Sequence, residues 1–464
     1  MRSWMLKVVI LCLSAAPVLC QSSEGKEFWF GFLNNYSNKP RSSYTAVNIS
    51  SSTDAIVHVS GPRLNWYVKV EVKRDSAVTV DIPKEHTVFH RSGTVDDKAV
   101  HIISDQNINV VALNYERETA DAALIYPVAS LGTDYLAIGY TASGYSRNEI
   151  LVVGTRDSTI VFVTYAVGRN HERATDTFSL DSGQTIQLSS RGDLTGTSVK
   201  SMTYPIAVFS GVDCADVPVR SSRVCCCDHL YEQVPPLASW GTKFVTIPYQ
   251  TRRADSYRFL ASKDSTDIFI NGNQVLTLAA GRFKDTIFGN PSVVTSSKPI
   301  MVAQFSNGQF FDGKDSDPFM VLLSPAEHTR NAITFGAFKS RVIKNYYLNV
   351  VLKSEDVPSL ILDGDSSVWR QFTYVDSTKE YMYAQLDIEQ GRHTLKADGA
   401  GFNAYVYGYG NYESFGYNAG TRLDPNVPIQ PTNFLLIFSI VGGVLVSAGG
   451  GYYFYRKQKA KAQV

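Results

Sequence analysis

The segment DHLYEQVPPLASWGTKFVTIPY, residues 228–249, indicates how this chain is built. It starts with an acid, carries prolines near its middle and ends in a run where apolar and polar residues alternate. Two further segments have the same layout: DAALIYPVASLGTDYLAIGY at 121–140 and DPFMVLLSPAEHTRNAITFGAF at 317–338. With the related strands around them, they predict about four copies of one structural unit.

Short alternating runs also predict strands along the rest of the chain. Examples are VKVEV (68–72), TIVFVTY (159–165) and TDIFING (266–272), which are rich in β-branched and aromatic residues. Such runs, interrupted by turn residues, are typical of an all-β protein. The spacing between Pro205 and Pro299 gives a repeat that fits a sandwich of about seven strands, and it is long for a propeller blade of ~40–50 residues. We therefore expect tandem antiparallel β-sandwich-like repeats, with a β-propeller-like fold as the alternative.

Both ends of the chain carry apolar runs. Residues 1–20 have a basic start and a short apolar stretch, which predicts a secretory signal peptide. Residues 434–455 contain no charged residue and are long enough for one C-terminal transmembrane helix. The basic tail, 456–464, predicts the cytoplasmic side. The chain is thus expected to be a single-pass type I protein of the plasma membrane, with its ectodomain outside.

The expected ectodomain divides into repeats and a stalk. Proline recurs after Gly420, which predicts a semi-rigid segment above the membrane. The expected boundaries are 21–145, 146–250, 251–341 and 342–420 for the four β repeats and 421–433 for the Pro-rich stalk.

Charge and motifs limit the function classes. The formal net charge is +1, which predicts no nucleic-acid partner. The sequons at Asn35 and Asn48 predict glycosylation outside the cell. The sequence shows no catalytic motif, so no catalytic residue, cofactor or enzyme activity is predicted.

Four cysteines follow the predicted signal peptide, and three of them are consecutive: Cys225, Cys226 and Cys227. Neighbouring cysteines bridge poorly, because their Cα atoms are ~3.8 Å apart and a disulfide needs ~4.4–6.8 Å. Cys214 can pair with any of the three, so the residues alone leave three pairings open.

Several motifs together resemble the IgGFc-binding protein N-terminal domain family. They are GDLTGTSV (192–199), PIAVFSG (205–211), CDHLYEQVPP (227–236) and YVYGYGNYESFGYNAG (405–420). The resemblance covers most of residues 26–420 and implies an extracellular protein that binds or adheres.

The resemblance also implies a disulfide between Cys214 and Cys227. Cys225 and Cys226 depart from the family pattern and are expected to be free or intermolecular, which suggests a disulfide-linked homodimer. The competing arrangement pairs Cys214 with Cys226 and Cys225 with Cys227.

Two other motifs are candidate sites. Arg191, Gly192 and Asp193 form an integrin-type tripeptide, although a local turn also explains the aspartate. Asp312, Asp315 and Asp317 are weak calcium candidates, and a solvated loop is the simpler interpretation.

The sequence therefore predicts a non-enzymatic cell-surface protein that binds or adheres through its β modules. Its expected partner is an extracellular protein or glycoprotein, with an immunoglobulin Fc region as one candidate. The alternatives are a surface hydrolase, whose site is not visible in the linear sequence, and a structural coat protein.

Overall fold

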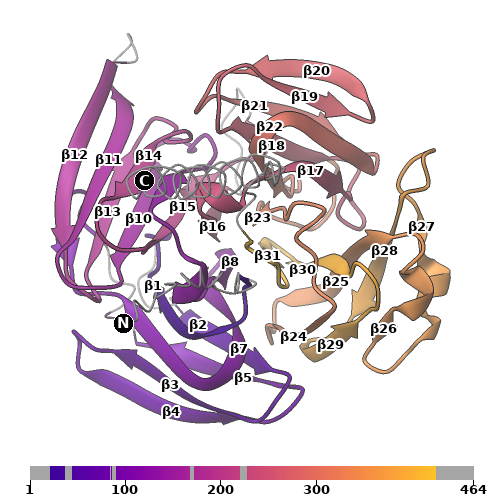
Figure 1. Ribbon diagram of the computed structural model, residues 1–464, viewed down its shortest axis with the longest axis horizontal. Coiled ribbons are helices and arrows are strands. Elements are labelled where there is room, and N and C mark those ends of the chain that lie inside the picture. The colour runs from indigo at the N-terminus through magenta and orange to yellow at the C-terminus, as the bar shows by residue number, and fades with distance from the viewer. Residues whose placement is uncertain are drawn as a thin grey trace, which may run out of the picture. The chain divides into compact units, whose positions relative to one another are not determined.

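A computed structural model describes residues 21–36, 44–83, 85, 90–167, 172–219 and 227–424. Chain contacts divide the protein into residues 1–425 and 426–464. The described residues contain strands and short 3-10 helices and no α-helix. This confirms the prediction of an all-β protein. The described strands fall into four groups (Figure 1), which follow the chain order except that β6 pairs with the second group.

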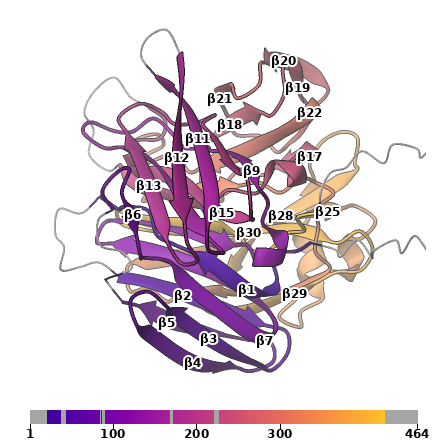
Figure 2. The same ribbon diagram turned by 60° about the vertical axis from the view of Figure 1, so that its left-hand side comes forward.

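The first group is a curled antiparallel sheet in the order β4-β3-β7-β2-β5, with β1 and β8 also paired to β7. The long β7 connects the two ends of this sheet, because its first half pairs with β3 and its second half pairs with β2. Figure 2 shows β2, β3, β4, β5 and β7 side by side. The strands are β1 (Gly25–Phe30), β2 (Tyr44–Ser51), β3 (Ala55–Gly61), β4 (Trp66–Val72), β5 (Ser76–Ile82), β7 (Val100–Glu116) and β8 (Thr119–Ile125).

The second group has two sheets, β16-β15-β10-β13-β6 and β12-β11-β14-β9. The 3-10 helix η2 (Val128–Ser130) leads into it. Its strands are β6 (Val95–Asp96), β9 (Asp134–Leu136), β10 (Asn148–Gly154), β11 (Thr159–Val167), β12 (Glu172–Leu180), β13 (Thr185–Ser190), β14 (Ser198–Ser201), β15 (Ile206–Ala215) and β16 (Asp228–Gln233).

The third group is a sheet in the order β20-β19-β22-β18-β21, with β17 and β23 also paired to β22. The 3-10 helix η3 (Leu237–Ser239) precedes it. Its strands are β17 (Gly241–Thr246), β18 (Asp255–Ala261), β19 (Thr266–Ile270), β20 (Asn273–Leu278), β21 (Phe283–Phe288), β22 (Ser292–Phe305) and β23 (Met320–Leu322).

The fourth group has the sheets β24-β29-β26 and β27-β28-β25-β30-β31. Two 3-10 helices, η4 (Val357–Ser359) and η5 (Ser367–Gln371), lie between its strands. The strands are β24 (Ala332–Ala337), β25 (Ile343–Lys353), β26 (Ile361–Leu362), β27 (Thr373–Tyr374), β28 (Tyr381–Ile388), β29 (Gly391–Lys396), β30 (Phe402–Gly410) and β31 (Glu413–Asn418).

The last strands of the four groups meet one another. β8 contacts β16 and β31, and β23 contacts the same two strands. Figure 1 shows the four between the sheet groups. Every residue of these strands is buried, because sheets or neighbouring groups cover both faces. In β8 the sequence TADAALI supplies small side chains that allow such close approach.

The hydrophobic cores cross the boundaries between groups. One core joins Val47 of β2 to Phe335 of β24, and another joins Val208 of β15 to Met301 of β22. Self-contained tandem sandwiches are therefore not confirmed, because each group buries apolar surface against its neighbours. The four innermost strands have the closure that a propeller-like fold requires. That alternative stays a prediction, since two groups are divided into separate sheets.

The two ends of the described chain close the arrangement. Ser22 forms a β-bridge with Arg422, and the Leu423 N–H donates to the Gln21 carbonyl at 2.8 Å. Arg330, which precedes β24, donates to Ser22 at 2.7 Å and pairs with Glu24. The seam between the first and fourth groups is therefore held by residues from both ends.

Candidate functional site

A buried carboxylate lies where the four innermost strands meet. Asp121 Oδ1 accepts hydrogen bonds from the N–H groups of Ala122 (2.9 Å) and Gly416 (3.4 Å). Its Oδ2 accepts from Tyr231 and Met320, both at 3.1 Å. One donor thus comes from each of β8, β31, β16 and β23. Burial raises the pKa of Asp121, and these four donors oppose the rise by stabilising the anion.

Glu232 is buried within β16 and accepts a hydrogen bond from the Leu322 N–H of β23 at 3.1 Å. Three further acids are buried around the ends of these strands: Asp228, Asp317 and Glu413. Burial, together with the charges of the other two acids, raises the pKa of Asp228. Burial also raises the pKa of Asp317 and of Glu413 to about 8. Each has one carboxyl oxygen without a hydrogen-bond partner among the described residues. Asp317 and Glu413 are therefore largely protonated at neutral pH.

A cavity of about 520 Å³ opens at the seam between the first and fourth groups. We call it the seam cavity. Its walls come from β2, β7 and β8 on one side and from β25, β31 and the β24–β25 loop on the other. The lining residues are Tyr44, Leu113, Tyr115, Ala120, Phe338, Lys339, Ser340, Arg341, Val342, Ile343, Glu413, Ser414 and Phe415.

The β24–β25 loop supplies the charged part of the seam cavity. Lys339 and Arg341 are exposed. Val342, the residue just before β25, is 40% exposed. Ser340 Oγ accepts hydrogen bonds from the N–H groups of Val342 (3.1 Å) and Ile343 (3.2 Å). This local turn holds the loop, so both cations are presented at the cavity.

Glu413, at the start of β31, is the acid of the lining. Its Oε2 accepts from the Glu118 N–H at 3.3 Å, and Tyr115 forms a side-chain hydrogen bond with it. Its Oε1 has no partner among the described residues. Burial gives this carboxyl a raised pKa, so at neutral pH it can donate a hydrogen bond.

A comparison with known families identifies the chain. A family model described as IgGFc binding protein matches residues 121–408, which run from β8 into β30. The chain belongs to the IgGFc-binding protein family. This confirms the resemblance seen in the sequence motifs.

One curated relative has the same name as the family. The human (Homo sapiens) IgGFc-binding protein is 24% identical to this chain over 435 residues. The alignment covers 90% of this chain and 8% of that protein, so the chain spans a small part of its relative.

Solved structures give two weak similarities. A glycosyl hydrolase family 2 member from Bacteroides cellulosilyticus has a TM-score of 0.11 at 11% identity, over 48% of this chain and 29% of that one. A tetra-tandem repeat from the extending region of a large adhesion protein has a TM-score of 0.10 at 11% identity, over 85% and 98%. At these TM-scores, neither structure supports an argument about the fold or function of the present chain.

The predicted disulfide between Cys214 and Cys227 is confirmed, with Cα atoms 5.2 Å apart. It links the end of β15 to the residue before β16, next to the bulge where Val212 and Ala215 interrupt the ladder. Cys225 and Cys226 lie outside the described residues, and their free or intermolecular state stays a prediction.

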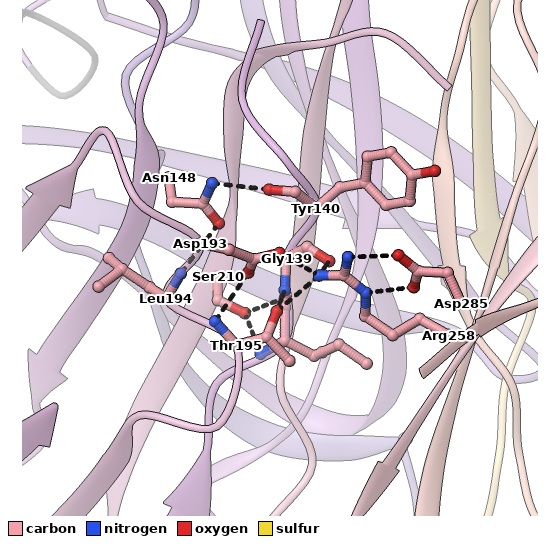
Figure 3. A network of polar contacts seen from close by, with 10 residues as sticks. Gly139, Tyr140, Asn148, Asp193, Leu194, Thr195, Ser210, Arg258 and Asp285 are labelled. Carbon is pink, nitrogen blue, oxygen red and sulfur yellow. Dashed lines mark hydrogen bonds and ion pairs between the residues drawn. The ribbon is translucent and has the colours of Figure 1, made fainter. Parts of the chain in front are cut away.

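The integrin-type tripeptide has a structural partner (Figure 3). Asp193 Oδ2 accepts from the guanidinium of Arg258, which is completely buried. Arg191 is exposed and lies over the Tyr145 ring at 5.6 Å. Asp193 therefore serves the contact between the second and third groups, and integrin binding stays a prediction.

The three calcium candidates do not converge. Asp312 forms an ion pair with Arg252 at 3.2 Å, whereas Asp317 lies with the buried acids of the innermost strands. Asp315 accepts from Arg252 through its backbone carbonyl. Within the described parts of the chain, no three acidic, histidine or cysteine side chains are placed to share a metal ion.

The side-chain amides of both predicted glycosylation sites donate hydrogen bonds within the fold. Asn48 is 6% exposed on β2, and its Nδ2 donates to Thr79 at 3.3 Å. The Nδ2 of Asn35 donates to the Thr119 carbonyl at 3.1 Å. Glycosylation of either asparagine stays a prediction, and burial disfavours it at Asn48.

The predicted signal peptide (1–20) and transmembrane helix (434–455) lie outside the described residues. In the part of the chain that the structure describes, no helix is long and apolar enough to cross a membrane.

The sequence reasoning did not single out Glu413, Lys339 or Arg341. It did note that each related segment begins with an aspartate, and those residues are Asp121, Asp228 and Asp317. This repeated aspartate was the sequence feature that could have indicated the buried acids at the innermost strands. No linear pattern brings the β24–β25 loop next to Tyr44.

Proposed function

We propose that this chain is a non-enzymatic extracellular binding protein, presented at the cell surface by the predicted span 434–455. The observation that carries the proposal is the family match, which covers two of the four innermost strands completely, β16 and β23, and most of β8. The disulfide between Cys214 and Cys227 supports an oxidising, extracellular location.

The seam cavity is the binding site in this proposal. Its volume falls in the range of ~300–1,000 Å³ that ligand pockets occupy, and apolar walls with a few polar groups are typical of such pockets. A protein or glycoprotein ligand would place one projecting group in it. Because the relative is named for IgG Fc, an immunoglobulin Fc region is the first ligand to test.

The cavity supports binding better than hydrolysis. Glycoside hydrolysis ordinarily uses two carboxyl groups on either side of the scissile bond. Of the described residues that line the seam cavity, Glu413 is the acid, and Asp228 and Asp317 are buried outside the lining. A hydrolase and a structural coat protein remain the alternatives that an experiment must separate.

The test uses the purified full-length chain, held in detergent on a biosensor surface. Intact IgG, its Fc fragment and its Fab fragment are titrated separately. The proposal predicts saturable binding of IgG and Fc, with no binding of Fab. If none of the three binds saturably, the Fc assignment is wrong, and hydrolysis of a glycan by the chain alone would overturn the non-enzymatic assignment.

The surface presentation has its own test. Protease added to intact cells should remove the ectodomain and leave a fragment that contains the span and the tail 456–464. An ectodomain that stays protected on intact cells would overturn the proposed topology.

A further inference from the structure

The charges of the seam cavity are unbalanced. Lys339 and Arg341 are exposed at its edge, and neither forms an ion pair with a described residue. The acid of the lining, Glu413, is buried and its raised pKa leaves it mostly neutral at pH 7. On the opposite wall, the exposed carboxylate of Asp81 accepts a hydrogen bond from Tyr44 at 2.7 Å. The positive charge is therefore concentrated on the β24–β25 loop, and that side of the cavity attracts an anion.

The polar groups of the cavity are also suited to hydrogen-bond acceptors. Lys339 and Arg341 offer only N–H donors. Ser340 Oγ already accepts from two backbone N–H groups, so its own O–H is left to donate. The Oε1 of Glu413 is buried and has no hydrogen-bond partner among the described residues, so the donors open to a ligand are those of the β24–β25 loop. A ligand carboxylate is the group that satisfies these donors.

The rest of the cavity is apolar. Phe338 and Phe415 are buried in its wall, and Leu113, Val342 and Ile343 complete the surface. A small inorganic anion would leave this surface in contact with water. A volume of about 520 Å³ has room for an apolar side chain as well as a carboxylate.

We infer that the seam cavity binds an acidic residue next to an apolar residue on a protein partner. The carboxylate contacts Lys339 and Arg341, and the apolar side chain packs against Phe338 and Phe415. The inference rests on the proposed function, because it names the chemistry by which that same site would recognise a protein.

The test measures binding of short peptides to the full-length chain by calorimetry. The probe is the acetylated, amidated dipeptide Phe-Glu, and Phe-Gln, Phe-Lys and Gly-Glu in the same form are its comparisons. Phe-Glu should bind in a saturable manner and more tightly than the other three. Its affinity should fall as the salt concentration rises from about 0.05 M to about 0.5 M.

Three variants and one control locate the site. Lys339→Glu and Arg341→Glu should each weaken Phe-Glu binding by about tenfold or more, because each removes a charge-assisted hydrogen bond. Lys344→Glu is the matched control: Lys344 is exposed in the same region but does not line the cavity, so its effect should stay below about twofold. Val342→Trp should block the cavity from its exposed edge.

Several outcomes overturn the inference: no binding of Phe-Glu, equal binding of Phe-Gln or Phe-Lys, or equal loss from the Lys344→Glu control. All four substituted residues are exposed, so each variant should fold. Unfolding midpoints equal to that of the unmodified chain check this. The inference and the proposed function fail separately. Fc binding that survives Arg341→Glu leaves the function standing without this site, and Phe-Glu binding without Fc binding does the reverse.

Discussion

The guanidinium of Arg258 on β18 donates a hydrogen bond to the carboxylate of Asp193 at 2.7 Å. The same guanidinium donates to the Gly139 carbonyl at 2.9 Å and pairs with Asp285 on β21 (Figure 3). Arg258 is completely buried, so each of these contacts replaces water that the cation has lost. The contact between the second and third groups therefore depends on the aspartate of the integrin-type tripeptide.

We expect Asp193→Ala to lower the free energy of unfolding by about 1–3 kcal/mol, because it removes a charge-assisted hydrogen bond and one of the two carboxylates that pair with the buried Arg258 cation. Arg191→Ala, in the same tripeptide, should change it by less than about 0.5 kcal/mol, since Arg191 is exposed. Denaturant unfolding compares the two. A stable Asp193→Ala chain that loses adhesion to integrin-coated surfaces would instead support the integrin interpretation.

Asp121→Asn should destabilise the fold by roughly 2–6 kcal/mol. Each carboxylate oxygen of Asp121 accepts two backbone N–H bonds. In either orientation, the asparagine amide therefore places its NH₂ group against two donors, at about 1–3 kcal/mol each. Asp398→Asn, at an exposed position on the fourth group, serves as the control and should be neutral. Equal unfolding midpoints for the two variants would show that the buried carboxylate does not hold the four strands together.

Stability should increase as the pH falls from 8 to 6.5. Burial raises the folded-state pKa of Asp317 and Glu413 to about 8, so the folded chain binds more protons than the unfolded chain in this range. Stability from such groups is complete below the unfolded pKa and is lost as the pH rises through the folded pKa. Each contributes at most about 1–2 kcal/mol over the interval.

The lower limit of that interval comes from two buried histidines. Burial lowers the pKa of His90 to about 4 and that of His229 to about 3. Below about pH 6.5 the unfolded chain therefore protonates these histidines while the folded chain does not, and their contribution to the free energy of unfolding declines. Thermal unfolding from pH 8 to 6.5 measures mainly the acids, because the unfolded histidines become half protonated only at the lower end of this range. Glu413→Gln should flatten the slope. A midpoint that falls over this interval, or a Glu413→Gln slope equal to that of the unmodified chain, would contradict the assignment.

The cysteines allow a separate test of stability and association. Replacing Cys214 and Cys227 with serine should cost about 3 kcal/mol, because the disulfide closes a loop with a sequence separation of 13. Replacing Cys225 and Cys226 with serine should leave stability unchanged and remove any covalent dimer. Gels without reductant and peptide mapping provide the readout. If only monomer is present before the second replacement, the proposed disulfide-linked homodimer does not form.

The sequence by itself determined the strands and the family. Alternation in runs such as 68–72 and 159–165 places apolar side chains on one face, and that information lies within a few neighbouring residues. The repeated acid at Asp121, Asp228 and Asp317 marked the last strands of three groups. The family resemblance supplied the partner of Cys214, which geometry along the chain left open.

Only the tertiary structure decided how the groups share their cores and where the candidate site lies. Tyr44 and Ile343 line one cavity although almost 300 positions separate them, because the first and fourth groups meet at the seam. Asp121 gains its four donors only when β8, β16, β23 and β31 come together. Such contacts depend on sheet curvature and on closure between the chain's ends, and neither is encoded in a local pattern of residues.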